Sequence, residues 1–168
     1  MKMKTIWICM IAVLGSRFYA YSQIHISIEE PYKDFGKVAI LLTNEFDHEV
    51  ILSTYSPLLS DNRNMGIKVD FRDDSNIIST WTYPFQVAGR KFHSAFPISP
   101  QETILIEPDL SDISKRLKDE LKSIEVSIGF LMVNPATNER YKVQDTFELN
   151  GGKNKLERNM TLCPIPQR

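Results

Sequence analysis

The sequence predicts a mainly β protein, an antiparallel β-sandwich of about seven to nine strands with one crossover helix. Apolar and polar residues alternate with a period of two over much of the chain, and turn-forming residues separate the alternating runs. One segment instead repeats its apolar residues at helical spacing. Strands of this kind have one apolar face, so a second sheet must cover the first.

The expected strands follow from this alternation. The alternating runs, each with one apolar face, are 24–29, 67–72, 124–133 and 141–149. Two further runs are more continuously apolar, which is typical of central strands: 36–43 and 49–54. Segments rich in Asn, Asp, Ser or Pro are expected to form the turns between strands: 44–47, 60–64, 73–76 and 134–138.

One helix is predicted over about residues 110–122. The apolar residues that repeat at three- and four-residue steps are Leu110, Ile113, Leu117, Leu121 and Ile124. Asp109 or Ser111 is expected to cap the first turn, and Pro108 to end the strand before it. Because so short a helix is marginal in water, its apolar side is expected to pack on the sheets as a crossover. A partner-binding helix is the less favoured alternative.

Residues 1–22 have the three parts of a secretory signal peptide. Two lysines precede an apolar run over 6–14, and the small residues Ala20 and Ser22 follow at a spacing suited to cleavage. We therefore expect cleavage between Ser22 and Gln23, and an exported protein that is periplasmic, on the cell surface or secreted. The apolar run is about half the roughly 20 residues of a membrane span, so the mature chain is expected to contain none.

The charge balance argues against a nucleic-acid partner. The 168 residues carry 20 basic and 21 acidic side chains, a net charge of −1. Removing residues 1–22 takes away three basic residues and no acidic one, which leaves 17 against 21 and a net charge of −4. Such a chain lacks the excess of positive charge on which nucleic-acid binding depends. The removal also leaves Cys163 as the one cysteine, so no internal disulfide is expected.

The number and spacing of the expected strands over most of residues 24–149 resemble those of immunoglobulin-like β-sandwiches. The resemblance is one of arrangement, since the Cys…Trp…Cys pattern of true immunoglobulin domains is absent. It implies one sandwich domain over residues 23–149. Residues 150–168 are expected to form a C-terminal tail, or to add a last edge strand near 160–162.

The sequence contains none of the common catalytic or metal-binding signatures. It lacks Gly-x-Ser-x-Gly, His-Glu-x-x-His, a phosphate-binding glycine loop and a metal-binding pair of cysteines. Its three histidines have no second ligand at a local spacing. Acidic residues gather at Asp70, Asp73 and Asp74, and a solvated turn is expected at Asp73 and Asp74. We therefore predict no catalytic residue, no metal and no cofactor.

The segment 81–97 is the best candidate for a binding surface. It places aromatic rings beside basic side chains, and rings supply stiff contact area while the donors orient an anionic or hydroxyl-rich ligand. The candidate ligand-binding residues are Trp81, Tyr83, Phe85, Arg90, Lys91 and His93. The alternative is that these rings fill the core, which is the more common place for large aromatic side chains.

These features favour a non-enzymatic exported protein that binds a protein or a glycan. One alternative is an enzyme, or an accessory domain of one, that acts on extracellular polymers. It requires the scattered aspartates and histidines to converge in one cleft. Another is a protease inhibitor that presents the segment 55–64 to the groove of an enzyme.

Overall fold

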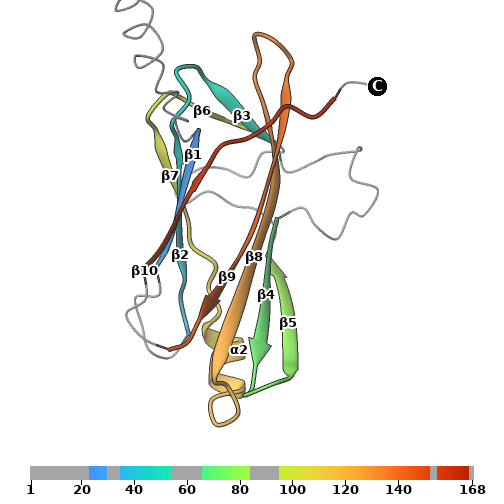
Figure 1. Ribbon diagram of the computed structural model, residues 1–168. Coiled ribbons are helices and arrows are strands. Elements are labelled where there is room, and N and C mark those ends of the chain that lie inside the picture. The colour runs from blue at the N-terminus through green and yellow to red at the C-terminus, as the bar shows by residue number, and fades with distance from the viewer. Residues whose placement is uncertain (1–22, 30–34, 54–65, 84–94, 152–154, 167–168) are drawn as a thin grey trace, which may run out of the picture.

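The computed structural model describes residues 23–29, 35–53, 66–83, 95–151 and 155–166. This part of the chain is mainly β and forms two antiparallel sheets that pack face to face (Figure 1). The predicted β-sandwich class is therefore confirmed. None of the helices in the described ranges is both long enough and apolar enough to cross a membrane.

The first sheet has four strands and joins the two ends of the described chain. Its order is β10 (Lys155–Met160), β1 (Ile24–Glu29), β2 (Ala39–Asn44) and β7 (Thr103–Ile106). All neighbours are antiparallel, and β1 pairs with β10 over its full length, from Ile24 opposite Met160 to Glu29 opposite Lys155.

The second sheet has six strands and is curled. Its strands are β3 (Val50–Ser53), β4 (Gly66–Arg72), β5 (Ile77–Tyr83), β6 (Ala95–Ile98), β8 (Ser123–Val133) and β9 (Arg140–Leu149). The long strand β8 pairs with β9 over residues 124–133. Its other side pairs first with β4 and then with β3, and β5 and β6 extend these two halves outward.

The core lies between the sheets and is built by the period-two alternation. Ile24, Ile26 and Ile28 of β1 are completely buried, and Val69 and Phe71 of β4 meet them from the other sheet. The largest fully buried rings are Phe71, Phe96, Phe130 and Phe147. The alternation predicted correctly which side chains face the core. A shift of one residue would turn every apolar side chain of a strand toward water.

The helix is shorter than predicted. α2 spans Ser111–Arg116 and does not continue to residue 122. Leu117 leaves the helical conformation, and the Lys122 amide already donates to the Arg72 carbonyl of β4 at 2.9 Å, which draws the chain into β8. The prediction of a core-packed crossover is confirmed, because Leu110 is buried and Ile113, Leu117 and Leu121 pack on the core.

The structure has ten strands in its described residues, more than the seven to nine expected. The alternation did not single out β5, β6 or β7. β6 contains Pro97, a residue that weakens a strand signal but is tolerated at a sheet edge. The last edge strand exists but covers Lys155–Met160, ahead of the expected 160–162.

Candidate interaction site

Two of the six predicted ligand-binding residues lie in the described structure. Trp81 and Tyr83 belong to β5, the outermost strand on one side of the six-stranded sheet. The other four lie outside the described residues: Phe85, Arg90, Lys91 and His93.

The register of β5 divides its side chains into two rows. Val69 and Ile67 of β4, which face the core, lie opposite Trp81 and Tyr83, so these two rings point inward. A bulge lies opposite Phe71, where the register shifts by one residue. The inner row, which is half-buried, is Ile78, Ser79, Trp81 and Tyr83, and the exposed outer row is Ile77, Thr80 and Thr82.

The two rings form a pair at the open side of the sandwich. Their centroids lie 5.2 Å apart with an angle of 31° between the planes, and both pack against the core. Burial raises the pKa of the Tyr83 phenol above its usual value. Each ring is only half-buried, so both retain surface beside the outer edge of β5.

Gly66 makes the close approach of β4 to the end of β5 sterically feasible. Its φ is +122°, a conformation that side-chain-bearing residues rarely adopt. A Cβ atom at this position would also lie 3.0 Å from the Tyr83 carbonyl oxygen. The glycine therefore helps to fix the position of Tyr83.

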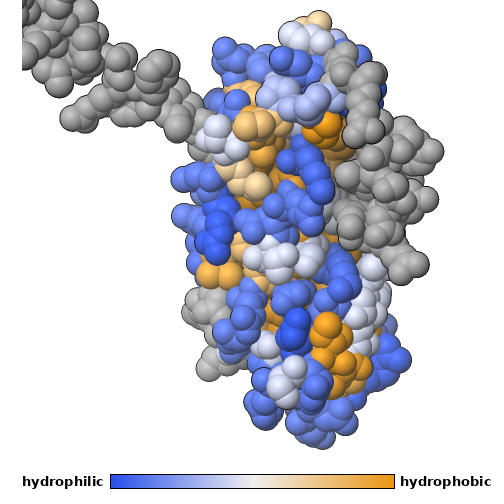
Figure 2. Space-filling model, turned by 45° about the vertical axis from the view of Figure 1, so that its right-hand side comes forward, coloured by the Kyte–Doolittle hydropathy of each residue, from blue (hydrophilic) through white to orange (hydrophobic). Residues whose placement is uncertain are grey.

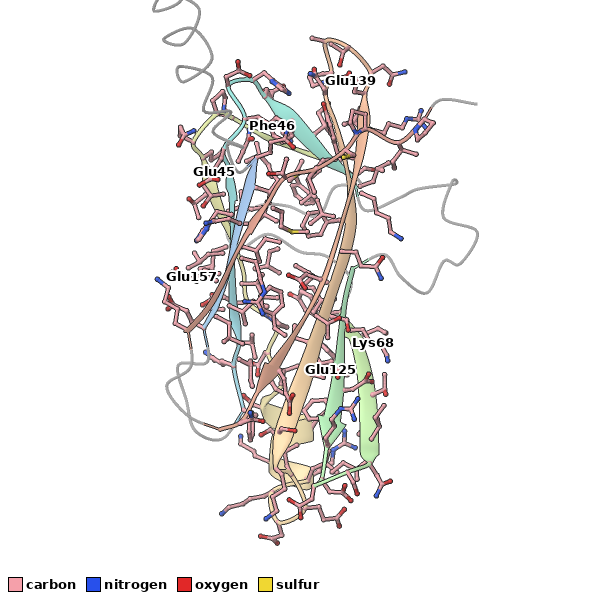
Figure 3. The ribbon with its side chains drawn as sticks, viewed as in Figure 1. Glu45, Phe46, Lys68, Glu125, Glu139 and Glu157 are labelled. Atoms are coloured by element: carbon pink, nitrogen blue, oxygen red, sulfur yellow. The ribbon has the colours of Figure 1, made fainter. Side chains whose placement is uncertain are left out.

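A polar network on the outer face anchors β5 to β4. The Asp70 carboxylate is buried and accepts from Thr80 Oγ1 and from Lys68 Nζ, each at 2.5 Å. One strand further, Arg72 pairs with Glu125 of β8 at 3.1 Å. Figure 3 shows Lys68 and Glu125 on this sheet, far from Glu139 and Phe46 at the other end of the molecule.

This network buries Asp70, which the alternation of strand 67–72 assigns to the polar face. Only Asp73 and Asp74 lie in the exposed turn between β4 and β5. Asp73 accepts from the Ser75 and Asn76 amides, which lowers the pKa of its carboxyl group. Sequence reasoning missed the role of Asp70 because a charged residue inside an alternating strand usually points to water.

The free edges of the two sheets differ in their protection against pairing with another chain. β10 carries Lys155, Glu157 and Arg158, and β7 and β6 have four residues each, with Pro97 in β6. β9 carries charges along its length, and the Ile165 amide donates to its Arg140 carbonyl at 2.7 Å. Charges, proline, shortness and covering segments are the usual devices that prevent edge pairing.

β5 lacks charge and proline, and its one protective feature is the bulge near its start. Its seven residues, Ile-Ile-Ser-Thr-Trp-Thr-Tyr, contain no charge and no proline, and all but Ser79 are β-branched or aromatic. Ile77 is 49% exposed and is the one large apolar side chain that the described residues expose to this extent. Figure 2 shows hydrophobic residues at the surface in the lower half of the molecule, where β5 lies. The bulge limits regular pairing to Ser79–Tyr83.

The described residues do not bring the candidate catalytic groups together. His25 Nδ1 lies 2.5 Å from Asn159 Oδ1 on the four-stranded sheet, and His48 Nδ1 lies 2.8 Å from Asp47 Oδ1 in the turn after β2. His93 lies outside the described residues. Within the described ranges, no three His, Cys, Asp or Glu residues are placed to hold a metal ion.

Comparison of the chain with protein-family models, with curated proteins and with solved structures finds no significant match. The function proposed below rests on the fold and on the edge of β5.

Proposed function

We propose that this chain is an exported, non-enzymatic β-sandwich of immunoglobulin-like arrangement that binds a protein by strand addition at β5. The observation that carries the proposal is the contrast between β5 and the other described sheet edges. An added strand is held by main-chain hydrogen bonds to β5. The inner and outer rows of β5 then determine which side chains fit on each face of the added strand. β5 offers both an uncharged edge of five regularly paired residues and the half-buried pair of Trp81 and Tyr83.

A protein is favoured over a glycan because of the direction of the two rings. Glycans usually stack on flat aromatic side chains that are exposed, whereas Trp81 and Tyr83 point inward and pack on the core. A strand beside β5 would contact the edges of these rings and cover the outer row of threonines. The protease-inhibitor alternative rests on residues 55–64, which lie outside the described structure.

Export is proposed from the signal-like N-terminus, and the contacts of Gln23 support it. Gln23 follows the expected cleavage point, and its amide donates to the Met160 carbonyl at 2.8 Å. Its side-chain oxygen accepts from the Leu162 amide at 2.6 Å. The sandwich thus has a well-anchored first residue at the position that cleavage would create.

Site-specific photo-crosslinking in cells tests the proposed binding edge. A photoreactive amino acid at position 82, exposed on β5, is compared with the same amino acid at position 144, exposed on β9. We expect a discrete protein adduct, identified by mass spectrometry, from position 82 alone. Absence of an adduct at position 82, or the same adducts from both positions, would contradict the proposal.

A further inference from the structure

We propose that the strand added at β5 is the β5 strand of a second copy of this chain, in antiparallel twofold pairing centred on Trp81. This inference rests on the proposed function, because it names the partner of the same edge. A twofold axis requires one surface to be complementary to itself. The five regularly paired residues, Ser79–Tyr83, meet that requirement in side-chain size, polarity and charge.

The inner row is complementary in size. In an antiparallel pair centred on Trp81, this residue lies opposite its own copy, and Ser79 lies opposite Tyr83 of the partner. The small serine leaves room for the phenol, and the two indoles meet across the axis. Aromatic cross-strand pairs add stability to sheets beyond the area that they bury. The half-buried state of Trp81 and Tyr83 leaves ring surface available for these contacts.

The outer row is complementary in polarity. The same register places Thr80 opposite Thr82 of the partner on both sides of the axis. Threonines that lie opposite each other on neighbouring strands stabilise the pair of strands. They leave few polar groups buried without a hydrogen-bond partner. Thr80 already donates to Asp70 at 2.5 Å, so its orientation is fixed before pairing.

Charge also permits a second copy at this edge. β5 has no charged residue, so twofold pairing brings no like charges together. The nearest charges, Lys68 and Asp70 of β4, neutralise each other within one copy. β10 and β9 instead carry lysine, arginine and glutamate side chains, so twofold pairing there is restricted to registers that keep like charges apart. Like charges directly opposite each other destabilise a strand pair.

Sedimentation velocity over a range of concentrations measures the pairing. The interface is narrow, so we expect a reversible monomer–dimer equilibrium with a dissociation constant in the range of about 1–100 μM. Thr82→Lys is expected to raise this constant at least tenfold, because it puts two lysines within reach of each other across the axis. The matched control Gln144→Lys adds the same charge to an exposed position of β9 and is expected to change the constant less than twofold.

Charge rescue tests the register. A mixture of Thr82→Lys and Thr82→Glu chains is expected to dimerise at least tenfold more tightly than either variant alone, since position 82 of each copy lies diagonal to that of the other. Thr82 is exposed, so both variants are expected to fold, and urea unfolding verifies this. A tightening on mixing that is less than twofold would reject the proposed register.

The indoles give an independent readout. The mature chain expected after cleavage, residues 23–168, has Trp81 as its one tryptophan, so each copy contributes one indole. We expect an exciton couplet in the circular dichroism spectrum that grows with protein concentration, because two indoles then meet only between copies. Contacts within one chain, such as Trp81 with Tyr83, contribute equally at every concentration.

The outcomes separate this inference from the proposed function. A chain that stays monomeric at the highest attainable concentration, or equal effects of Thr82→Lys and Gln144→Lys, overturns the second copy as partner. If position 82 then still crosslinks to a different protein, strand addition at β5 stands with another occupant. If it crosslinks to nothing, both proposals fall.

Discussion

Asn44 connects two turns of the sandwich through a single buried side chain. Its Nδ2 donates to the carbonyl oxygens of His48, Ile98 and Ser99 at 3.0–3.1 Å, and its Oδ1 accepts from the Phe46 amide at 3.0 Å. The residue is completely buried, and its bonds to Ile98 and Phe46 are buried too, so these two groups cannot turn to water if the amide is removed. A buried polar group without a partner is costly.

Asn44→Ala is therefore expected to lower the free energy of unfolding by about 2–4 kcal/mol, measured by urea denaturation. Asn76→Ala is the matched control, because the Asn76 side chain is exposed and its hydrogen bonds, to Ser75 Oγ at 3.3 Å and to the Asp73 carboxyl group, lie in a surface turn. The control is expected to stay within about 0.5 kcal/mol of the parent chain. Equal effects of the two substitutions would show that Asn44 does not hold the turns.

Gly66→Ala is expected to destabilise the fold by about 1–3 kcal/mol, because the new Cβ meets the Tyr83 carbonyl and the φ of +122° is strained for alanine. Gly151 also has a positive φ, +67°, so Gly151→Ala is the comparison for the strain that a left-handed backbone imposes on alanine. Urea denaturation of both variants measures the difference. A Gly66→Ala chain as stable as the parent would refute the close approach of β4 and β5.

At the scale of elements, the start of α2 depends on one carboxylate. Asp109 Oδ1 accepts from the Ser111 amide at 3.0 Å. The hydrogen bonds from Ser111 hold the pKa of the Asp109 carboxyl below its usual 3.8, and Lys37 and Lys115 add to this. The helix N-cap itself is Leu110, which has no side-chain bond, so Asp109 acts from one residue before the cap.

This lowered pKa predicts a stability difference at acid pH. A carboxyl whose folded-state pKa is depressed stabilises the fold above its unfolded-state pKa, and that contribution is lost as the pH falls through the folded value. Relative to Asp109→Asn, which keeps an acceptor oxygen but does not titrate, the parent chain is expected to lose stability below about pH 4. Urea midpoints of the two chains at pH 6 and pH 3 measure this, and a constant difference between them would contradict it.

The period-two strands were predictable because one buried face dictates their pattern, as in β1, β4, β8 and β9. The length of α2 was not, because tertiary contacts of Lys122 with β4 end a helical pattern that the sequence continues. β5 was missed as a strand, although its residues have high β propensity. At the bulge, one extra residue shifts which positions of β5 point inward, so its sequence does not show a regular alternation.

The candidate site was predictable only in part for a similar reason. The aromatic content marked Trp81 and Tyr83, but their inward direction depends on pairing with β4. The feature that carries the proposal, an edge without charge or proline, becomes visible once the order of strands is known. A run of uncharged residues in the sequence does not reveal whether it lies in the middle of a sheet or at its edge.

At the scale of the whole molecule, the described fold is held by its core and contains no disulfide. Cys163 is free and exposed, beside the segment that contacts β9. A reducing agent is therefore expected to leave the unfolding temperature unchanged, and Cys163→Ser to shift it by less than about 2 °C. Differential scanning calorimetry with and without dithiothreitol measures both. A drop on reduction would indicate a covalent contribution between copies.

The pairing of β1 with β10 has a consequence for biosynthesis. Ile24 and Met160 are partners in one sheet, although 135 residues separate them along the chain. The ribosome makes β1 among the first segments and β10 among the last, so the four-stranded sheet cannot close until synthesis is nearly complete. Folding that depends on such distant contacts is slow. A nascent chain that has not completed its fold stays unfolded, and this is the state in which the proposed export would pass it through a secretion channel.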